Sequence, residues 1–183
     1  KNMGGKGGYV IYVGSLTVPL HNNWANLAVE YQKKTYPEMF EVTSRMPVAE
    51  SIDASFAATN DLMKAHPEMK GIVSYGSLGL IGAGEAIKKK RAKNKISTAG
   101  ILMPAQAAPY LKGGEIKKGF LWNPADAGYA LVSVSKDMLD GKKVTDGVEV
   151  KDLGKAEIDT QKQVIKFNKI LEVDSNNATS LGF

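Results

Sequence analysis

The sequence contains no cysteine, which excludes disulfide bonds, thiolate metal ligands and thiol nucleophiles. Histidine is scarce: His21 and His66 are the only two, and their spacing is not that of metal ligands. No apolar run approaches the roughly 18 residues of a transmembrane helix. Residues 1–5 lead directly into a predicted strand, without the apolar core of about 7–15 residues that marks a signal peptide. Composition therefore indicates a globular chain with a sizeable core and without thiol chemistry.

The net charge of +5 raises the question of a nucleic-acid partner. The densest basic run covers residues 88–91, with Lys93 and Lys95 close behind it. This run follows a helical pattern, and cations at the carboxyl end of a helix interact favourably with its dipole. No aromatic residue interleaves it as a base-stacking surface requires. We therefore interpret the run as a solvated helix end and expect no nucleic-acid partner.

Apolar, strand-like runs alternate with helix-periodic segments along most of the chain. The expected strands are residues 9–13, 40–44, 71–75, 97–102 and 118–122, each followed by a helix. This succession predicts an α/β fold with a doubly wound parallel sheet in a three-layer α/β/α arrangement. Beyond Gly141 the pattern loosens: residues 144–151 suggest a strand, residues 163–167 an edge strand, and residues 168–183 form a polar tail.

Two of the expected helices carry patterns that predict how they pack. In the first helix, Trp24, Leu27, Ala28 and Tyr31 recur at helical spacing and predict a core-facing stripe. In the third helix, Gly82-Ala83-Gly84 lies inside the helical pattern, where small residues permit close packing against a neighbour.

The ends of the predicted strands are rich in neutral hydrogen-bonding and aromatic side chains. In an open parallel sheet, ligands bind beyond the carboxyl ends of the strands. Amides and hydroxyls suit a polyhydroxylated ligand, and an aromatic face covers its C–H surface. Glu50 is the one carboxylate in this set. Its other prominent members are Thr17, His21, Asn22, Asn23, Trp24, Tyr75, Ser77, Gln106, Trp122 and Asn123.

Several of these residues have a structural interpretation as well. Asn22, Asn23 and Ser77 suit helix N-caps. Trp24 suits the core, and Trp122 suits a strand-end anchor. Catalysis has little support, because the sequence has no nucleophile elbow and His21 with Glu50 is the only conceivable acid–base pair. The glycines of residues 4–8 precede a strand, whereas phosphate loops follow one. We expect no enzyme, no cofactor and no metal.

Several segments resemble one known family. They are Leu16-Thr17-Val18 with Asn22-Asn23-Trp24, residues 60–67, Gly119-Phe120-Leu121-Trp122-Asn123-Pro124, and Val164-Ile165 with Phe167-Asn168. The chain resembles the latter part of the ribose-type periplasmic solute-binding proteins of ABC importers. Within that family it is similar to the branch of autoinducer-2-binding and rhamnose-binding proteins. The resemblance covers essentially the whole sequence.

The resemblance implies two α/β lobes that hold a ligand between them, with this chain beginning at the second lobe. Residues 1–122 would form that carboxyl-terminal lobe. Residues 123–150 would be a crossover helix and strand that pack on the missing first lobe, and residues 151–183 a return hinge segment and tail. The implied function is capture of a sugar, polyol or autoinducer-2-like molecule and its delivery to a membrane permease. The implied location is the periplasm, or a lipoprotein outside the cytoplasmic membrane.

The family's pocket positions, carried over one by one, give the expected ligand-binding residues. The start of the first helix carries an acid and an amide in autoinducer-2 binders, and here it falls on Leu20-His21. The position after the fourth strand, commonly an aspartate, falls on Leu102-Met103. This pocket therefore keeps the family's location without its usual charges. The expected set is His21, Asn22, Glu50, Tyr75, Gly76, Ser77, Met103, Trp122 and Asn123.

An alternative interpretation shares the same fold. The ligand-sensing core of a lactose-repressor-type transcription regulator would place the protein in the cytoplasm, with a DNA-binding helix-turn-helix before it. The branch-like terminal segments and the lysine-rich surface favour transport over regulation.

Overall fold

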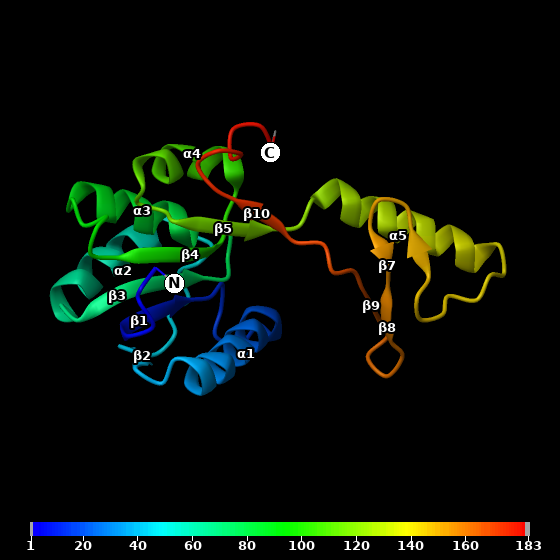
Figure 1. The fold of residues 1–183 in the computed structure, drawn as a ribbon, viewed down its shortest axis with the longest axis horizontal. Coiled ribbons are helices and arrows are strands. Elements are labelled where there is room, and N and C mark those ends of the chain that lie inside the picture. The colour runs from blue at the N-terminus through cyan, green and yellow to red at the C-terminus, as the bar shows by residue number, and fades with distance from the viewer. Residues whose placement is uncertain (1, 182–183) are drawn as a thin grey trace. The chain divides into compact units, whose positions relative to one another are not determined.

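The structure is a computed structural model that describes residues 2–181. It divides into two compact units (Figure 1). Unit 1 comprises the residues through Phe120 together with those from Glu172 onward, and unit 2 is Leu121–Leu171. No helix of the described residues is long and apolar enough to cross a membrane.

Unit 1 is built on a six-stranded sheet in the order β10-β5-β4-β3-β1-β2. The pairs β1–β2, β1–β3, β3–β4 and β4–β5 are all parallel, which confirms the predicted α/β fold. The central strand β1 is apolar and buried from Tyr9 to Tyr12, as expected for a strand covered on both faces. The strands are β1 (Gly7–Tyr12), β2 (Met39–Glu41), β3 (Met69–Ser74), β4 (Ser97–Ile101), β5 (Lys118–Leu121) and β10 (Leu171–Val173).

Four helices accompany this sheet: α1 (Pro19–Thr35), α2 (Ile52–Ala65), α3 (Gly79–Lys89) and α4 (Pro104–Gly113). Successive side chains of a strand point to opposite faces. Tyr9, Ile11 and Val13 pack with Ala25 of α1. Tyr12 points the other way, where its hydroxyl lies 2.8 Å from the Thr59 hydroxyl of α2. Therefore α1 and α2 cover opposite faces of β1.

The close packing predicted for the glycine-rich part of α3 is confirmed. A Cβ added to Gly82 would lie 2.2 Å from both the Ile52 carbonyl oxygen and the Ser55 Oγ of α2. Only a residue without a side chain fits at that distance. Gly82 therefore sets the separation of α2 and α3.

The predicted core stripe of α1 is wrong. Leu27 and Tyr31 are 65% and 64% exposed, and the buried residues of this helix are Ala25 and Gln32. Gln32 is satisfied in place: its Oε1 accepts from the Tyr9 hydroxyl at 2.9 Å, and its Nε2 donates to the Tyr36 and Met39 carbonyls at 2.8 Å. The helix is therefore docked by Ala25 and the fully bonded Gln32, with Val29 packed against the same core, whereas Leu27 and Tyr31 lie on the outer face.

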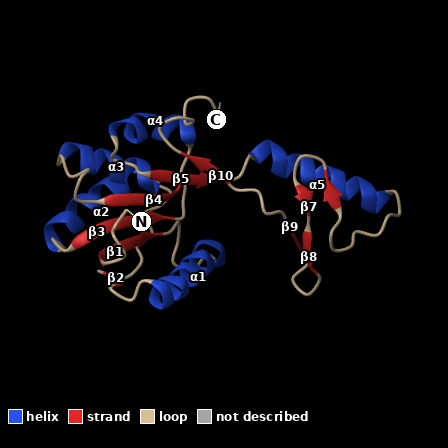
Figure 2. Ribbon diagram, viewed as in Figure 1, coloured by secondary structure: helices blue, strands red, loops and turns tan. Residues whose placement is uncertain are grey.

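Unit 2 consists of α5 (Pro124–Leu139) and two short antiparallel hairpins, visible in Figure 2. The hairpins are β6 (Glu149–Val150) with β7 (Gly154–Lys155), and β8 (Glu157–Asp159) with β9 (Val164–Lys166). Its small core joins Ala130 and Val134 of α5 to Val150. On the same helix Leu131 and Met138 are exposed, at 71% and 63%.

Several element boundaries differ from those expected. The edge strand predicted at residues 163–167 is present as β9, whereas the strand predicted at residues 144–151 is reduced to β6. Residues 40–44 contribute only to the three-residue β2, and β10 lies inside the tail for which no strand is predicted. The predicted boundary after residue 122 lies beside that between the units, and the lobe and hinge roles stay predictions. Residues 1, 182 and 183, which the predicted ranges include, lie outside the described residues.

Candidate ligand-binding site at the carboxyl ends of β1 and β3

The segments that follow β1 and β2 meet around Gly14, because these two strands are parallel neighbours. The Gly14 amide donates to His21 Nδ1 at 3.0 Å. A Cβ placed on Gly14 would lie 3.1 Å from both the His21 ring and the Glu50 Cγ. His21 and Glu50, 29 residues apart in the sequence, thus flank the same short piece of backbone. Two of the predicted pocket segments, those that carry His21 and Glu50, therefore lie side by side.

Glu50 links the segment before α2 to the loop after β3. Its Oε2 accepts from the Ser77 hydroxyl at 2.9 Å and from the Ser77 amide at 3.3 Å. Gly76 brings the two segments together, since a Cβ there would lie 2.7 Å from the Ala49 Cβ and 2.8 Å from the Ala49 carbonyl oxygen. The second carboxylate oxygen, Oε1, lies against Gly76, 2.4 Å from the position of an added Cβ, and Glu50 as a residue is exposed. Ser77 is thus bonded to Glu50. The N-cap of α3 is Leu78, so the interpretation of Ser77 as an N-cap is wrong.

His21 presents a hydrogen-bond donor beside an aromatic surface. Its Nδ1 accepts from Gly14, so the neutral ring carries its proton on Nε2 and can donate there. The ring stacks on Trp24 with centroids 5.7 Å apart, and Trp24 in turn meets Tyr75 at 6.4 Å. Burial raises the pKa of Tyr75, so its phenol stays neutral. The half-buried Trp24 is thus a wall of the site as well as a packing residue.

Asn22 has its amide group committed to holding the loop before α1. Its Nδ2 donates to the carbonyl oxygens of Ser15 at 3.0 Å and Val18 at 2.8 Å. Its Oδ1 accepts from Arg45 Nη1 at 3.2 Å. The N-cap of α1 is Val18, so the interpretation of Asn22 as an N-cap is wrong. Direct ligand contact by Asn22 stays a prediction, and what the structure shows is a positioning role.

Arg45 is the residue that the sequence reasoning missed. It follows β2, and its Nη2 also donates to the Asn26 side chain at 2.7 Å. It therefore ties the β2–α2 connection to α1 beside Tyr75, whose pKa its charge acts to lower. A signal was available, because Arg45 is one of only two arginines and lies just after a predicted strand.

The three other predicted residues, Met103, Trp122 and Asn123, directly precede the helices α4 and α5. Met103 is the half-buried N-cap residue of α4, just after β4. Trp122 and Asn123 belong to unit 2, where the Asn123 Oδ1 accepts from the Ala125 amide at 2.9 Å and caps α5. A ligand-binding role for these three residues stays a prediction. The site that unit 1 shows by itself is formed by His21, Glu50, Tyr75, Gly76 and Ser77, with Trp24.

This arrangement can bind a polar, uncharged molecule. It offers a carboxylate acceptor, a hydroxyl, an imidazole donor and two aromatic faces, which match hydroxyl groups and C–H surface. Within residues 2–181 there is no group of three or more acidic, histidine or cysteine side chains that could hold a metal ion. The Ser77 hydroxyl is bonded to the Glu50 carboxylate and not to the His21 imidazole, so the geometry favours binding over nucleophilic catalysis.

Comparison with known proteins gives a family and a consistent fold. The family described as "Periplasmic binding protein domain" matches residues 1–143. No curated protein sequence matches the chain. Among solved structures, a sugar ABC transporter protein from Actinomyces odontolyticus is similar over 100% of this chain, with 21% identity and a TM-score of 0.84. LsrB from Clostridium saccharobutylicum in complex with AI-2 is similar over 96%, with 19% identity and a TM-score of 0.81.

A third similar structure is an ABC transporter solute-binding protein from Clostridium phytofermentas with bound L-rhamnose. It matches 98% of this chain at 19% identity and a TM-score of 0.79. The chain spans only 59%, 59% and 60% of the lengths of these three proteins, in the order given. At such identities the likeness shows the fold alone.

Proposed function

The chain belongs to the periplasmic binding protein domain family, a family of binding proteins and not of enzymes, and from this premise we propose that it captures a solute for an ABC importer. The proposed ligand is a sugar, a polyol or an autoinducer-2-like molecule. The observation that carries the proposal is the His21–Glu50–Ser77 cluster beside Trp24 and Tyr75. Similar structures carry AI-2 and L-rhamnose, which are ligands of the same polar class.

The cluster is proposed to be one half of the binding site. A drug-sized ligand in a well-formed site has about 70–90% of its surface covered, whereas His21, Glu50 and Ser77 lie at the surface of unit 1. The proposed other half is a first lobe, which would account for the 59% coverage of the similar structures. In this proposal residues 1–122 form the second lobe, residues 123–150 cross to the first, and residues 151–183 return.

Unit 2 offers a surface for that first lobe. A hollow of about 470 Å³ lies along α5, and Leu131, Met138 and Phe167 line it with apolar groups. Of four apolar residues at helical spacing along α5, Ala127, Leu131 and Met138 are exposed, whereas Val134 is buried in the small core of unit 2. Exposed side chains as large as Leu131 and Met138 suit a surface that another domain covers.

Two further parts of the proposal concern the whole protein. Its partner would be a membrane permease that receives the ligand, and it would work in the periplasm or as a lipoprotein outside the cytoplasmic membrane. The family assignment and the sugar-transporter likeness support both parts.

A thermal-shift screen tests the proposal. The two-lobe protein, meaning this chain joined to its proposed first lobe, is heated with a panel of sugars, polyols and autoinducer-2. A ligand that binds only the folded state stabilises it by about 2.7 kcal/mol at a hundredfold excess over Kd, which raises Tm by several degrees. Charged metabolites and nucleotides serve as the comparison panel. A response confined to that comparison panel would contradict the proposed ligand class.

A further inference from the structure

Unit 1 carries the entire excess positive charge of the chain. Lysine and arginine number 16 against 11 acidic residues in unit 1, and 8 against 8 in unit 2. The last turns of α1, α2, α3 and α4 each contain lysine. In a parallel α/β sheet the helices all end near the amino ends of the strands. The fold therefore gathers cations at the end of the sheet opposite the candidate ligand-binding site.

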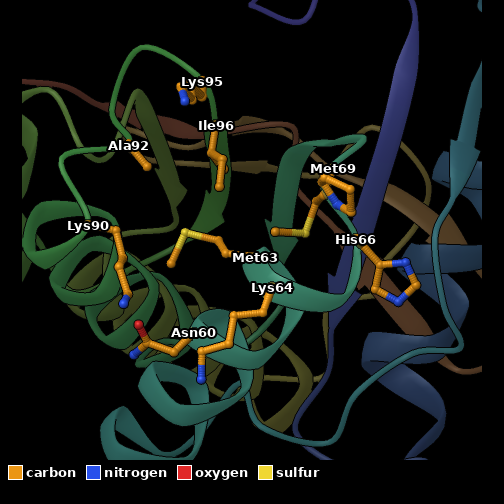
Figure 3. Close-up of a pocket in the computed structure, with 10 residues that line it drawn as sticks. Asn60, Met63, Lys64, His66, Met69, Lys90, Ala92, Lys95 and Ile96 are labelled. Atoms are coloured by element: carbon orange, nitrogen blue, oxygen red, sulfur yellow. The ribbon is translucent and has the colours of Figure 1, made fainter.

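A hollow of about 330 Å³ lies at this end of the sheet, between the ends of α2 and α3 and the starts of β3 and β4. Its apolar part is formed by Met63 together with the buried Met69 and Ile96. Lys64, Lys90 and Lys95 stand around it, exposed to solvent. Figure 3 shows Met63 in the middle, between Lys90 on one side and Met69 and His66 on the other. The hollow thus combines an apolar floor with a cationic rim.

The charge balance at the rim is positive. No carboxylate lines the hollow, and the nearby Asp61 and Glu68 are engaged with Lys64 at 3.5 Å and His66 at 3.1 Å. Lys90 and Lys95 have no acidic partner among the described residues. The carboxyl ends of α2 and α3 contribute about half a negative charge each. Two unpaired lysines exceed that sum, so an anion entering the hollow is attracted.

We propose that this hollow binds a small amphipathic anion: a phosphate, sulfonate or carboxylate group on a short alkyl or aryl body. The acid group would lie between Lys90 and Lys95, and the body would lie on Met63, Met69 and Ile96. The volume is within the range of about 300–1,000 Å³ that small-molecule sites occupy. This site is independent of the proposed sugar site, which lies at the other end of β3 and carries no unpaired lysine in its cluster.

The two methionines make the proposal directly measurable. The 183-residue chain, labelled with ¹³C in its methionine methyl groups, is titrated with n-hexyl phosphate and observed by NMR. We expect saturable shifts of the Met63 and Met69 methyl signals, with those of Met103 and Met138 unmoved. n-Hexanol, which lacks the charge, and inorganic phosphate, which lacks the body, should each produce less than about a tenth of the response.

Matched triple variants separate the hollow from the general basic charge. Exposed ion pairs contribute about 0.2–1 kcal/mol each, so replacing Lys64, Lys90 and Lys95 by Gln should weaken n-hexyl phosphate binding about tenfold. Replacing Lys33, Lys34 and Lys112 by Gln removes the same charge from the ends of α1 and α4 and should leave affinity within about twofold. Equal losses in both variants, or equal shifts with n-hexanol, would overturn the proposal.

Discussion

Replacing Gly82 by alanine tests how closely α2 and α3 pack. At an exposed helix position this change stabilises a protein by about 1 kcal/mol, because alanine is the better helix former. At Gly82 the new methyl group would lie 2.2 Å from the Ile52 carbonyl oxygen. This oxygen belongs to the backbone of α2, so it cannot move aside by a side-chain rotation. Overpacking of this kind costs about 1–3 kcal/mol or more. We therefore expect a net loss of about 1–2 kcal/mol in the free energy of unfolding of unit 1.

Two other glycines provide a graded comparison. A methyl group on Gly84 would meet the Tyr110 and Ile116 side chains at 3.1–3.2 Å, which can shift, so Gly84→Ala should be nearly neutral. Gly128 of α5 has nothing within 4 Å of the added atom, so Gly128→Ala should stabilise unit 2 by about 0.5–1 kcal/mol. The variants should therefore rank Gly128→Ala, Gly84→Ala and Gly82→Ala in decreasing stability relative to the parent, in the order of the distance from the added Cβ to its nearest neighbour.

Urea unfolding measured by tryptophan fluorescence can separate the units. Trp24 reports unit 1 and Trp122 reports unit 2, so each is observed in a background where the other is replaced by phenylalanine. With a slope of about 1–3 kcal/mol per M, Gly82→Ala should lower the midpoint of the Trp24 transition by roughly 0.5–1 M. A Gly82→Ala protein as stable as the parent would show that α2 and α3 are further apart than the structure places them.

Two further predictions concern the core and the proposed lobe contact. Burial raises the pKa of Tyr12 to about 12, so its stabilising contribution is complete below pH 10 and is lost as the pH rises from 10 to 12. Between pH 10 and 12 the free energy of unfolding should therefore fall about 3 kcal/mol less in Tyr12→Phe than in the parent. Parallel pH profiles of the two proteins would contradict this prediction. Leu131→Asp should cost less than about 0.7 kcal/mol in this chain, where Leu131 is 71% exposed. In the two-lobe protein the same change should cost about 2 kcal/mol or more, since it would bury a charge. Equal losses of unfolding free energy in the two proteins, measured by urea unfolding, would refute the contact between α5 and the first lobe.

The fold was predictable because its signals are local. A run of residues such as Tyr9–Val13 is apolar along its whole length, and it is followed by a helix at every repetition. The failures came from non-local causes. The orientation of α1 depends on Gln32, whose buried amide accepts from the Tyr9 hydroxyl, 23 positions away in the sequence. The three-residue β10 has too little local pattern to be seen and forms because β5 lies beside it.

The candidate site was predictable as a location and less so in its details. Parallel strand ends converge, so the strand pattern alone was enough to place His21, Glu50 and Ser77 together. Which atoms remain available to a ligand could not be predicted, because that depends on competing partners. The amide of Asn22 is taken by the backbone of its own loop, and the bond from Arg45 to Asn22 joins residues 23 positions apart.

The most direct test of the account is a calorimetric titration of the two-lobe protein with the best ligand from the screen. His21→Ala removes the proposed Nε2 donor, and loss of one partner in a closed site typically costs about 1–3 kcal/mol. We predict a Kd about 5- to 150-fold weaker, and little or no binding by the 183-residue chain alone. Without ligand the variant should lose only a few degrees in Tm, because the Gly14 amide loses its acceptor. Parent-like affinity in His21→Ala, or micromolar binding by the single chain, would contradict a site shared between two lobes.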